Sequence, residues 1–181
     1  EVVADKFPNR VATISDDKPL SWQGFERRAS CIASLLEEHG LGPDSKAGLY
    51  LHNCSEYQEA QFGIFKVGGC PINVNYRYKS DELVYLLDNS DAEAVFFQSC
   101  YAMRIWEIRE RLPKVKLFVQ IDDGTESLLK GAVDYGRAIR THQPLPRRTQ
   151  NSDSVYMLYT GGTTGMPKGV MYPVGQFAQF F

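Results

Sequence analysis

The stretch KAGLYLHNCSEYQEAQFGIFKVGGCPINVN, residues 46–75, places a helical pattern between two apolar segments. Residues 46–51 predict a strand, residues 56–67 predict a helix, and residues 70–75 predict a second strand with a buried character. Gly68 and Gly69 stop the helix before the second strand begins. A strand, a helix and another strand in this order form the repeating unit of parallel sheets.

The same alternation continues on both sides of this unit. Upstream, a short strand is followed by a helix whose N-cap is Ser21. Its apolar residues recur at helical spacing and form one buried face. The further elements that we expect are a strand over 11–14, the helix whose apolar face holds Trp22, Phe25, Ala29, Ile32 and Leu36, a helix capped by Ser80, strands over 94–97 and 115–121, and helices over 101–112 and 134–140. The sequence therefore predicts an α/β fold, a mainly parallel sheet flanked by helices on both faces.

Composition excludes several classes of protein. Of the 181 residues, 43% are hydrophobic and 23% are charged, which is ordinary for a globular chain and excludes collagen-like or disordered proteins. The net charge of −2, without a basic block, argues against nucleic acid as a partner. The longest apolar runs are far shorter than the ~20 residues of a spanning helix, so we expect no transmembrane segment. The chain does not begin with Met, and we expect a piece of a longer protein.

The four cysteines, Cys31, Cys54, Cys70 and Cys100, are widely spaced and form no C-x-x-C pair. The three histidines show no metal-ligand spacing relative to them. Each cysteine is therefore predicted to be a small buried apolar side chain.

Residues 141–152, THQPLPRRTQNS, contain two prolines and no apolar periodicity. This segment predicts a connection between subdomains, and Arg147 with Arg148 predicts a solvated charge pair. We therefore divide the chain into an α/β subdomain over 1–140, a connection over 141–152, and the start of a second, incomplete subdomain over 153–181. The strands of that last segment are expected to begin a second layer whose partners lie outside the chain.

The segment TGGTTGMPKG, residues 160–169, lies between a strand pattern over 155–159 and a short apolar run over 170–172. These ten residues hold four glycines, three threonines and one lysine. Glycines let backbone N–H groups approach an anion, threonine hydroxyls donate hydrogen bonds or ligate a hard cation, and lysine adds a positive charge. The composition predicts a loop that grips a triphosphate.

Two better-known phosphate motifs do not fit this segment. The mononucleotide pattern G-x-x-x-x-G-K-[ST] fails because Pro167 precedes Lys168 and Gly169 follows it. The dinucleotide pattern G-x-G-x-x-G fails because the glycines fall at 161, 162 and 165. A glycine-rich hairpin without a ligand is the other interpretation, and the threonines and the lysine weigh against it.

Residues 159–170, YTGGTTGMPKGV, resemble the phosphate-loop signature of the adenylate-forming, or AMP-binding, superfamily. That superfamily includes acyl-CoA synthetases, luciferases and the adenylation domains of peptide synthetases. Gly161 departs from the pattern, since most members carry Ser or Thr there. The resemblance covers nearly the whole chain, and segments over 8–12, 20–22, 73–78 and 131–135 carry it further. Residues 131–135, together with the TGGTTG variant over 160–165, are most similar to bacterial fatty-acyl-CoA synthetases of the lipid- and steroid-degrading type.

The resemblance implies the N-terminal portion of an ATP-dependent acyl-CoA synthetase, an acid–thiol ligase. Such enzymes form an acyl-adenylate from a fatty or related carboxylic acid, release pyrophosphate and transfer the acyl group to coenzyme A. ATP, Mg²⁺ and coenzyme A are the implied cofactors and co-substrates. Lys168 would be catalytic, and Thr160 would contact Mg²⁺. The implied ATP-binding residues are Thr160, Gly161, Gly162, Thr163, Thr164, Gly165 and Lys168.

Two other functions stay open beside this one. The first alternative is a non-catalytic nucleotide- or phosphate-binding module. The second is an adenylating enzyme that passes the acyl group to a carrier protein. The family's adenine site, its ribose-binding Asp, its hinge and its C-terminal catalytic lysine all lie beyond the phosphate loop, so we expect this chain alone to be inactive. Arg77 is either a contact for the phosphates of coenzyme A or an exposed arginine. The expected location is the cytoplasm, with peripheral membrane association and a homo-oligomer left open.

Overall fold

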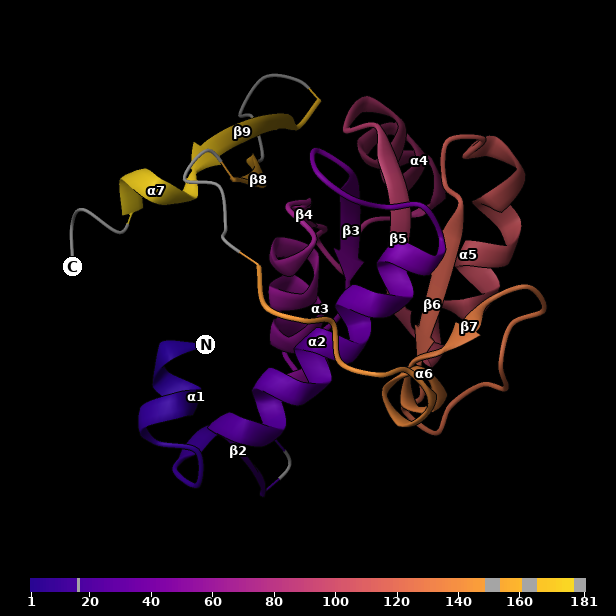
Figure 1. The fold of residues 1–181 in the computed structure, drawn as a ribbon. Coiled ribbons are helices and arrows are strands. Elements are labelled where there is room, and N and C mark those ends of the chain that lie inside the picture. The colour runs from indigo at the N-terminus through magenta and orange to yellow at the C-terminus, as the bar shows by residue number, and fades with distance from the viewer. Residues whose placement is uncertain (16, 149–153, 161–165, 178–181) are drawn as a thin grey trace.

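A single sheet organises the fold, with its strands in the order β7-β6-β5-β3-β4-β8-β9 (Figure 1). The computed structural model describes residues 1–15, 17–148, 154–160 and 166–177. Neighbouring strands run parallel from β7 to β8, and β9 is antiparallel to β8. The strands are β3 (Lys46–Tyr50), β4 (Cys70–Asn73), β5 (Ala92–Gln98), β6 (Leu117–Ile121), β7 (Val133–Asp134), β8 (Val155–Thr160) and β9 (Lys168–Pro173). The predicted α/β fold with a mainly parallel sheet is confirmed.

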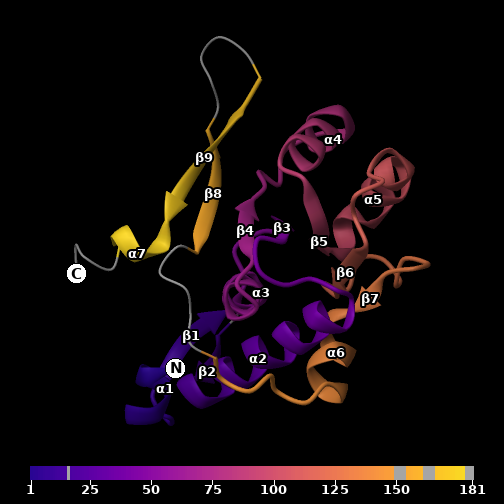
Figure 2. The same cartoon turned by 45° about the horizontal axis from the view of Figure 1, so that its top comes forward.

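Helices cover both faces of the sheet because the central strands are apolar on both sides. Along β5, Ala94 and Phe96 enter one buried cluster, whereas Val95 and Phe97 enter the other. The first cluster holds residues of α2 (Trp22–Glu38), α3 (Ser55–Lys66) and α6 (Tyr135–Thr141), and the second holds residues of α4 (Ser80–Asn89) and α5 (Ala102–Ile108). Figure 2 shows α4 and α5 on the side of the sheet away from α2 and α6. This alternation is the two-sided burial expected of parallel strands.

The helix α2 begins where the sequence predicts. The side chain of Ser21 accepts a hydrogen bond from the backbone N–H of Gly24 at 3.1 Å, which satisfies one of the free donors of the first turn. Four residues of the predicted apolar face are buried, and the fifth, Trp22, is half-buried with its ring edge-on to Phe25. Gly40, with a φ of +72°, follows the helix end and adopts a conformation that favours glycine.

Several elements differ from the prediction. Ser80 is the first residue of α4 rather than its cap, and the Glu82 carboxylate accepts a hydrogen bond from the N–H of Lys79 at 2.9 Å instead. The expected helix over 101–112 is α5 flanked by two 3₁₀ turns, η1 (Ser99–Tyr101) and η2 (Arg109–Arg111). The elements that the sequence did not indicate are α1 (Val2–Lys6), β2 (Lys18–Ser21), which pairs with β1 (Val11–Ser15), the short β7, and α7 (Val174–Phe177).

The expectation that the strands around the glycine-rich segment begin a separate layer is wrong. β8 pairs in parallel with β4, through Ile72 with Met157 and Asn73 with Leu158. These strands therefore continue the same sheet. The boundaries of the three predicted segments, 1–140, 141–152 and 153–181, stay a prediction.

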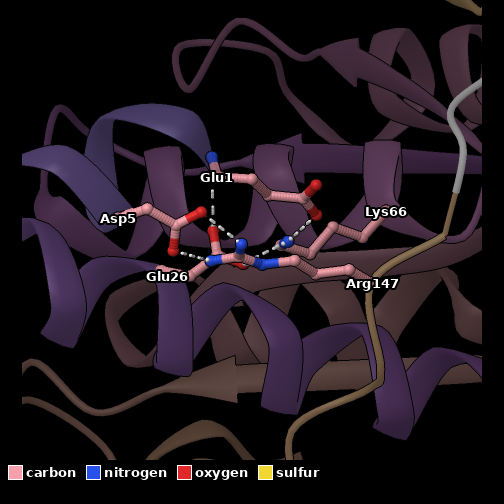
Figure 3. A network of polar contacts seen from close by, with 5 residues as sticks. All are labelled: Glu1, Asp5, Glu26, Lys66 and Arg147. Atoms are coloured by element: carbon pink, nitrogen blue, oxygen red, sulfur yellow. Dashed lines mark hydrogen bonds and ion pairs between the residues drawn. The ribbon is translucent and has the colours of Figure 1, made fainter.

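Arg147 and Arg148 are both exposed, as predicted for a solvated pair, and each also forms an ion pair. The Arg147 guanidinium donates to both carboxylate oxygens of Asp5 at 2.6 and 2.8 Å, and Arg148 donates to Glu37 on α2. Figure 3 shows Arg147 beside a second group in which Lys66 bonds both Glu1 and Glu26 at 2.7 Å. The sequence could not anticipate these pairs because their partners lie more than 100 positions away. These ion pairs join residues 147–148 to α1 and α2.

The cysteine prediction is correct for some positions and wrong for one. Cys31 and Cys70 are buried, Cys54 is half-buried, and Cys100 is exposed because it lies in the 3₁₀ turn that follows β5. Across the described ranges, no helix combines the length and the apolar character that crossing a membrane requires.

Candidate phosphate-binding site

The candidate site lies on the hairpin formed by β8 and β9. Its strands pair from Val155 with Pro173 to Thr160 with Lys168. Thr160 therefore ends one strand and Lys168 begins the other, directly opposite. Lys168 and Gly169 were expected in the loop, and the structure places both in β9. The connection is shorter than predicted because cross-strand pairing extends past the apolar runs that mark the strands in the sequence.

Five of the predicted site residues lie outside the described residues. These are Gly161, Gly162, Thr163, Thr164 and Gly165. The structure therefore describes the two ends of the segment, Thr160 and Lys168, and brings them together as a cross-strand pair.

The hairpin projects from the edge of the sheet at which ligands commonly bind. β8 runs parallel to β4, so Thr160 lies at the carboxyl edge, together with the last residues of β3, β4 and β5. In open α/β sheets, ligands bind outside the carboxyl ends of the strands. Thr160 lies two residues beyond Leu158, the last residue of β8 that pairs with β4. Thr160 and Lys168, the described ends of the predicted site, therefore lie at the edge where this type of fold commonly binds ligands.

Lys168 is exposed, and it forms no ion pair with any residue that the structure describes. Its ammonium group is therefore not neutralised by a neighbouring carboxylate in the described part of the chain. A lysine in that state is suited to a phosphate, to which it acts as a point charge. Thr160 is exposed as well and offers a hydroxyl beside it.

The two ends of the hairpin contact α4, a feature that sequence reasoning missed. The Tyr85 hydroxyl donates to the backbone carbonyl of Pro167 at 3.3 Å, and the Tyr159 hydroxyl donates to Asn89 Oδ1 at 2.8 Å. No motif marks these residues, although their spacing of four places both on one face of a helix. A tyrosine with an asparagine four positions later is too common a pair to have been a signal.

Polar aromatic residues also gather at the carboxyl edge of the sheet. The Tyr57 hydroxyl donates to Asn73 Oδ1 at 3.0 Å, and the Tyr101 hydroxyl lies 2.8 Å from His52 Nε2. Arg77 is exposed and lies over the ring of Tyr76, with 5.5 Å between its guanidinium carbon and the ring centroid. The role of Arg77 toward coenzyme A stays a prediction.

A separate hollow of about 460 Å³ lies at the opposite edge of the sheet, where β3, β4 and β8 begin. Of the three cationic residues on its wall, Lys66 and Arg148 are ion-paired with Glu26 and Glu37, and Lys46 donates to the backbone carbonyl of Asp44 at 3.1 Å. Two of its three cations are therefore already paired with carboxylates, whereas Lys168 forms no ion pair with any described residue.

Comparisons with known proteins agree with this arrangement. The sequence profile of the family "AMP-binding enzyme" matches residues 1–181. The chain is 39% identical over 177 residues to the 3-oxocholest-4-en-26-oate–CoA ligase of Rhodococcus rhodochrous, covering 95% of this chain and 32% of the relative. It is 39% identical over 179 residues to the medium/long-chain-fatty-acid–CoA/3-oxocholest-4-en-26-oate–CoA ligase of Mycobacterium marinum, with 95% and 32% covered.

A crystal structure of the anthranilate CoA ligase AuaEII with anthranoyl-AMP has the same fold. The TM-score is 0.91 at 23% identity, and the match covers 99% of this chain and 34% of that structure. The chain thus spans about a third of the length of the relatives it matches. Its fold, its glycine- and threonine-rich hairpin and its full-length profile match lead to one conclusion: the chain belongs to the AMP-binding enzyme family.

Proposed function

We propose that this chain is the N-terminal portion of an ATP-dependent acyl-CoA synthetase, and that the β8–β9 hairpin binds the β- and γ-phosphates of ATP. The observation that carries the proposal is the cross-strand pair of Thr160 and Lys168, which flanks the glycine- and threonine-rich segment at the carboxyl edge of the sheet. Family membership supports the proposed chemistry. The chain spans about a third of the length of its relatives, which supports its description as a portion of a longer enzyme.

The proposed reaction has two steps. In the first, a carboxylate oxygen of the acid attacks the α-phosphorus of ATP, and the bond to the bridging oxygen breaks to release pyrophosphate. In the second, the thiol of coenzyme A displaces AMP from the acyl-adenylate and forms a thioester. Negative charge builds on the leaving pyrophosphate during the first step, and donors that are already oriented toward it lower the barrier.

In this proposal, Lys168 bears directly on the β- and γ-phosphates and compensates the charge that develops there. The backbone N–H groups of Gly161, Gly162 and Gly165, with the hydroxyls of Thr163 and Thr164, would complete the grip. The hydroxyl of Thr160 is the candidate contact for Mg²⁺, which arrives with the nucleotide as MgATP. One exposed hydroxyl suits an ion that keeps most of its water and phosphate ligands, and it could not hold the ion alone.

The proposed acid is a fatty acid or a steroid side-chain carboxylate. This class is supported by the names of the two ligases that are 39% identical to the chain. We place the reaction in the cytoplasm, where ATP and coenzyme A are supplied. We also propose two subdomains, over residues 1–140 and 153–181, with a connection over residues 141–152.

The test is acyl-CoA formation by the full-length protein, with saturated fatty acids of graded length and a steroid side-chain acid. We expect ATP- and acid-dependent consumption of the coenzyme A thiol. Carboxylate-dependent exchange of pyrophosphate into ATP without thiol consumption would favour an enzyme that serves a carrier protein. Neither activity with any acid would favour the non-catalytic binding module and would refute the proposal.

A further inference from the structure

Two side chains of helix α4 contact the hairpin next to Lys168 and Thr160. Tyr85 donates to the carbonyl of Pro167, the residue immediately before Lys168, at 3.3 Å. Asn89 accepts from the hydroxyl of Tyr159, the residue immediately before Thr160, at 2.8 Å. A single helical face therefore contacts the end of β8 and the residue that immediately precedes β9.

The helix itself is a firm support. Leu83, Leu86 and Leu87 project from α4 into the core and are each at most 1% exposed. Tyr85 and Asn89 are four residues apart, so they lie one turn from each other on the same side of the helix. Movement of these two side chains away from the hairpin would require either a rotamer change or displacement of the buried leucines.

The end of the hairpin needs such a support because the sheet does not provide one. β8 pairs with β4 through Met157 and Leu158, whereas its pairing with β9 continues to Thr160 and Lys168. The last two residues of β8 therefore extend past the neighbouring parallel strand. A two-stranded ribbon that has no further neighbour is marginally stable and bends easily.

Gly169 makes room for the contact of Tyr159 with Asn89. It pairs with Tyr159 across the hairpin, and a Cβ atom at position 169 would lie only 3.1 Å from two carbons of the Tyr159 ring. The glycine thus lets the ring lie over β9 while the hydroxyl reaches Asn89. Burial raises the pKa of Tyr159, so its hydroxyl keeps its proton at neutral pH and donates.

The hydrogen bond to Pro167 constrains the peptide group that leads to Lys168, the lysine that binds phosphate in the proposed function. The peptide group between Pro167 and Lys168 is planar, so fixing its carbonyl oxygen fixes the orientation of the N–H and the Cα of Lys168. Proline also holds its own φ near −65°, which leaves few ways for the peptide to turn. The Tyr85 contact therefore sets the point from which the lysine side chain extends.

We propose that Tyr85 and Asn89 are positioning residues that hold Lys168 and Thr160 where they meet the phosphates of ATP. This inference rests on the proposed function of the hairpin. It adds that the precision of the phosphate site comes from α4 and not from the sheet. Small displacements of a binding group reduce the rate strongly, since misplacement by about 1 Å costs on the order of 100-fold.

The first test uses the full-length protein and steady-state pyrophosphate exchange. Tyr85→Phe removes one hydroxyl and keeps the ring, and we expect it to raise the KM for MgATP by roughly 5- to 30-fold, while the KM for the acid changes less than about twofold. Asn89→Ala should behave in the same way. Asn89→Asp keeps an acceptor for Tyr159 and should restore the KM for MgATP to within about twofold of the wild type.

The second test separates positioning from general loss of stability. In a Lys168→Ala background, Tyr85→Phe should add less than about a twofold effect, because the group that it positions is gone. Tyr135→Phe, which removes a buried hydroxyl bond to Glu59 on the other face of the sheet, serves as the structural control. It should leave the KM for MgATP unchanged.

The outcomes distinguish this inference from the proposed function. If the wild type exchanges pyrophosphate and Lys168→Ala impairs it, but Tyr85→Phe and Asn89→Ala match the Tyr135→Phe control, the positioning role is overturned and the proposed function stands. If the effects of Tyr85→Phe and Lys168→Ala multiply in full, Tyr85 does not act through the lysine and the inference is also overturned. If the wild type shows no exchange with any acid, both proposals fail.

Discussion

The buried carboxylate of Glu59 joins three helices and makes a specific test of how α6 is held. Glu59 on α3 is 0% exposed, and its Oε1 lies 2.8 Å from Nε of Arg28 on α2. Its Oε2 accepts a hydrogen bond from the Tyr135 hydroxyl at 2.6 Å. Tyr135 is the first residue of α6 and is 2% exposed, so no water replaces its hydroxyl without a change in packing.

Tyr135→Phe removes this donor and keeps the ring in the core. A buried acceptor that loses its partner costs about 1–3 kcal/mol, which corresponds to a change of roughly 5- to 150-fold in a local opening equilibrium. We expect the amides of α6 in the full-length protein to exchange with deuterium faster by that factor. Mass spectrometry of peptides that cover residues 135–141 measures the rate directly.

Tyr101→Phe provides the matched control, because its hydroxyl bond to His52 is solvent-exposed. An exposed bond of this kind contributes within about 0.5 kcal/mol, so the exchange of α6 should be unchanged. Equal exchange of α6 in Tyr135→Phe and in the wild type would refute the reasoning. It would mean that Glu59 is satisfied by Arg28 alone and that α6 is held by apolar packing.

Three further predictions concern packing, surface charge and thiol reactivity. A Cβ at Gly69 would lie 2.9 Å from a backbone carbonyl oxygen, so Gly69→Ala should lower the free energy of unfolding by about 1–3 kcal/mol. Gly42→Ala is the control, because its Cβ would meet open space, and it should change the free energy of unfolding by less than about 0.5 kcal/mol. Equal urea midpoints for the two variants would contradict this. Arg147→Gln removes an exposed ion pair with Asp5 and should leave the urea midpoint nearly unchanged, because solvent screens such pairs; a clear fall in the midpoint would contradict this. Cys100 is exposed, but partial desolvation and the neighbouring Asp123 raise its pKa to about 11, against an ordinary value of 9.0. At pH 8, iodoacetamide should therefore alkylate it about 100-fold more slowly than an unperturbed thiol, and an ordinary rate would contradict the raised pKa.

Much of the fold could be predicted because its signals are local. The spacing of Phe25, Ala29, Ile32 and Leu36 depends only on the helical repeat, and the cap at Ser21 depends on three residues. The strands β3 to β6 are mostly buried, so each appears in the sequence as a short segment rich in apolar residues. These elements are confirmed with boundaries that differ by a few residues.

The elements that were missed lack a local signal. β2 contains Pro19, which argues against a strand and is tolerated because β2 belongs to a separate two-stranded sheet at the periphery. β7 has two residues, too few to show any period. The pairing of β8 with β4 joins positions about 85 residues apart, and no pattern within either strand specifies its neighbour.

For the candidate site, the sequence indicated which residues suit phosphate binding, but not which contacts hold them in place. The glycines, the threonines and Lys168 were recognisable because phosphate binding requires those residue types close together. Gly169 was assigned to the loop among the glycines that let backbone N–H groups approach an anion, whereas the structure places it in β9 under the ring of Tyr159. Tyr85 and Asn89 could not be predicted, because their importance arises only from contacts with residues 70 to 82 positions away.

The most direct test of the central claim is carboxylate-dependent pyrophosphate exchange by the full-length protein with Lys168→Ala. Loss of a preorganised positive group at developing phosphate charge should reduce kcat/KM for MgATP by about 100- to 1,000-fold. Lys116→Ala, which removes an exposed lysine that pairs with Glu93 away from the hairpin, is the control and should retain exchange within about twofold. If the wild type exchanges pyrophosphate and Lys168→Ala exchanges it equally well, the hairpin does not bind the phosphates of ATP and the account is contradicted.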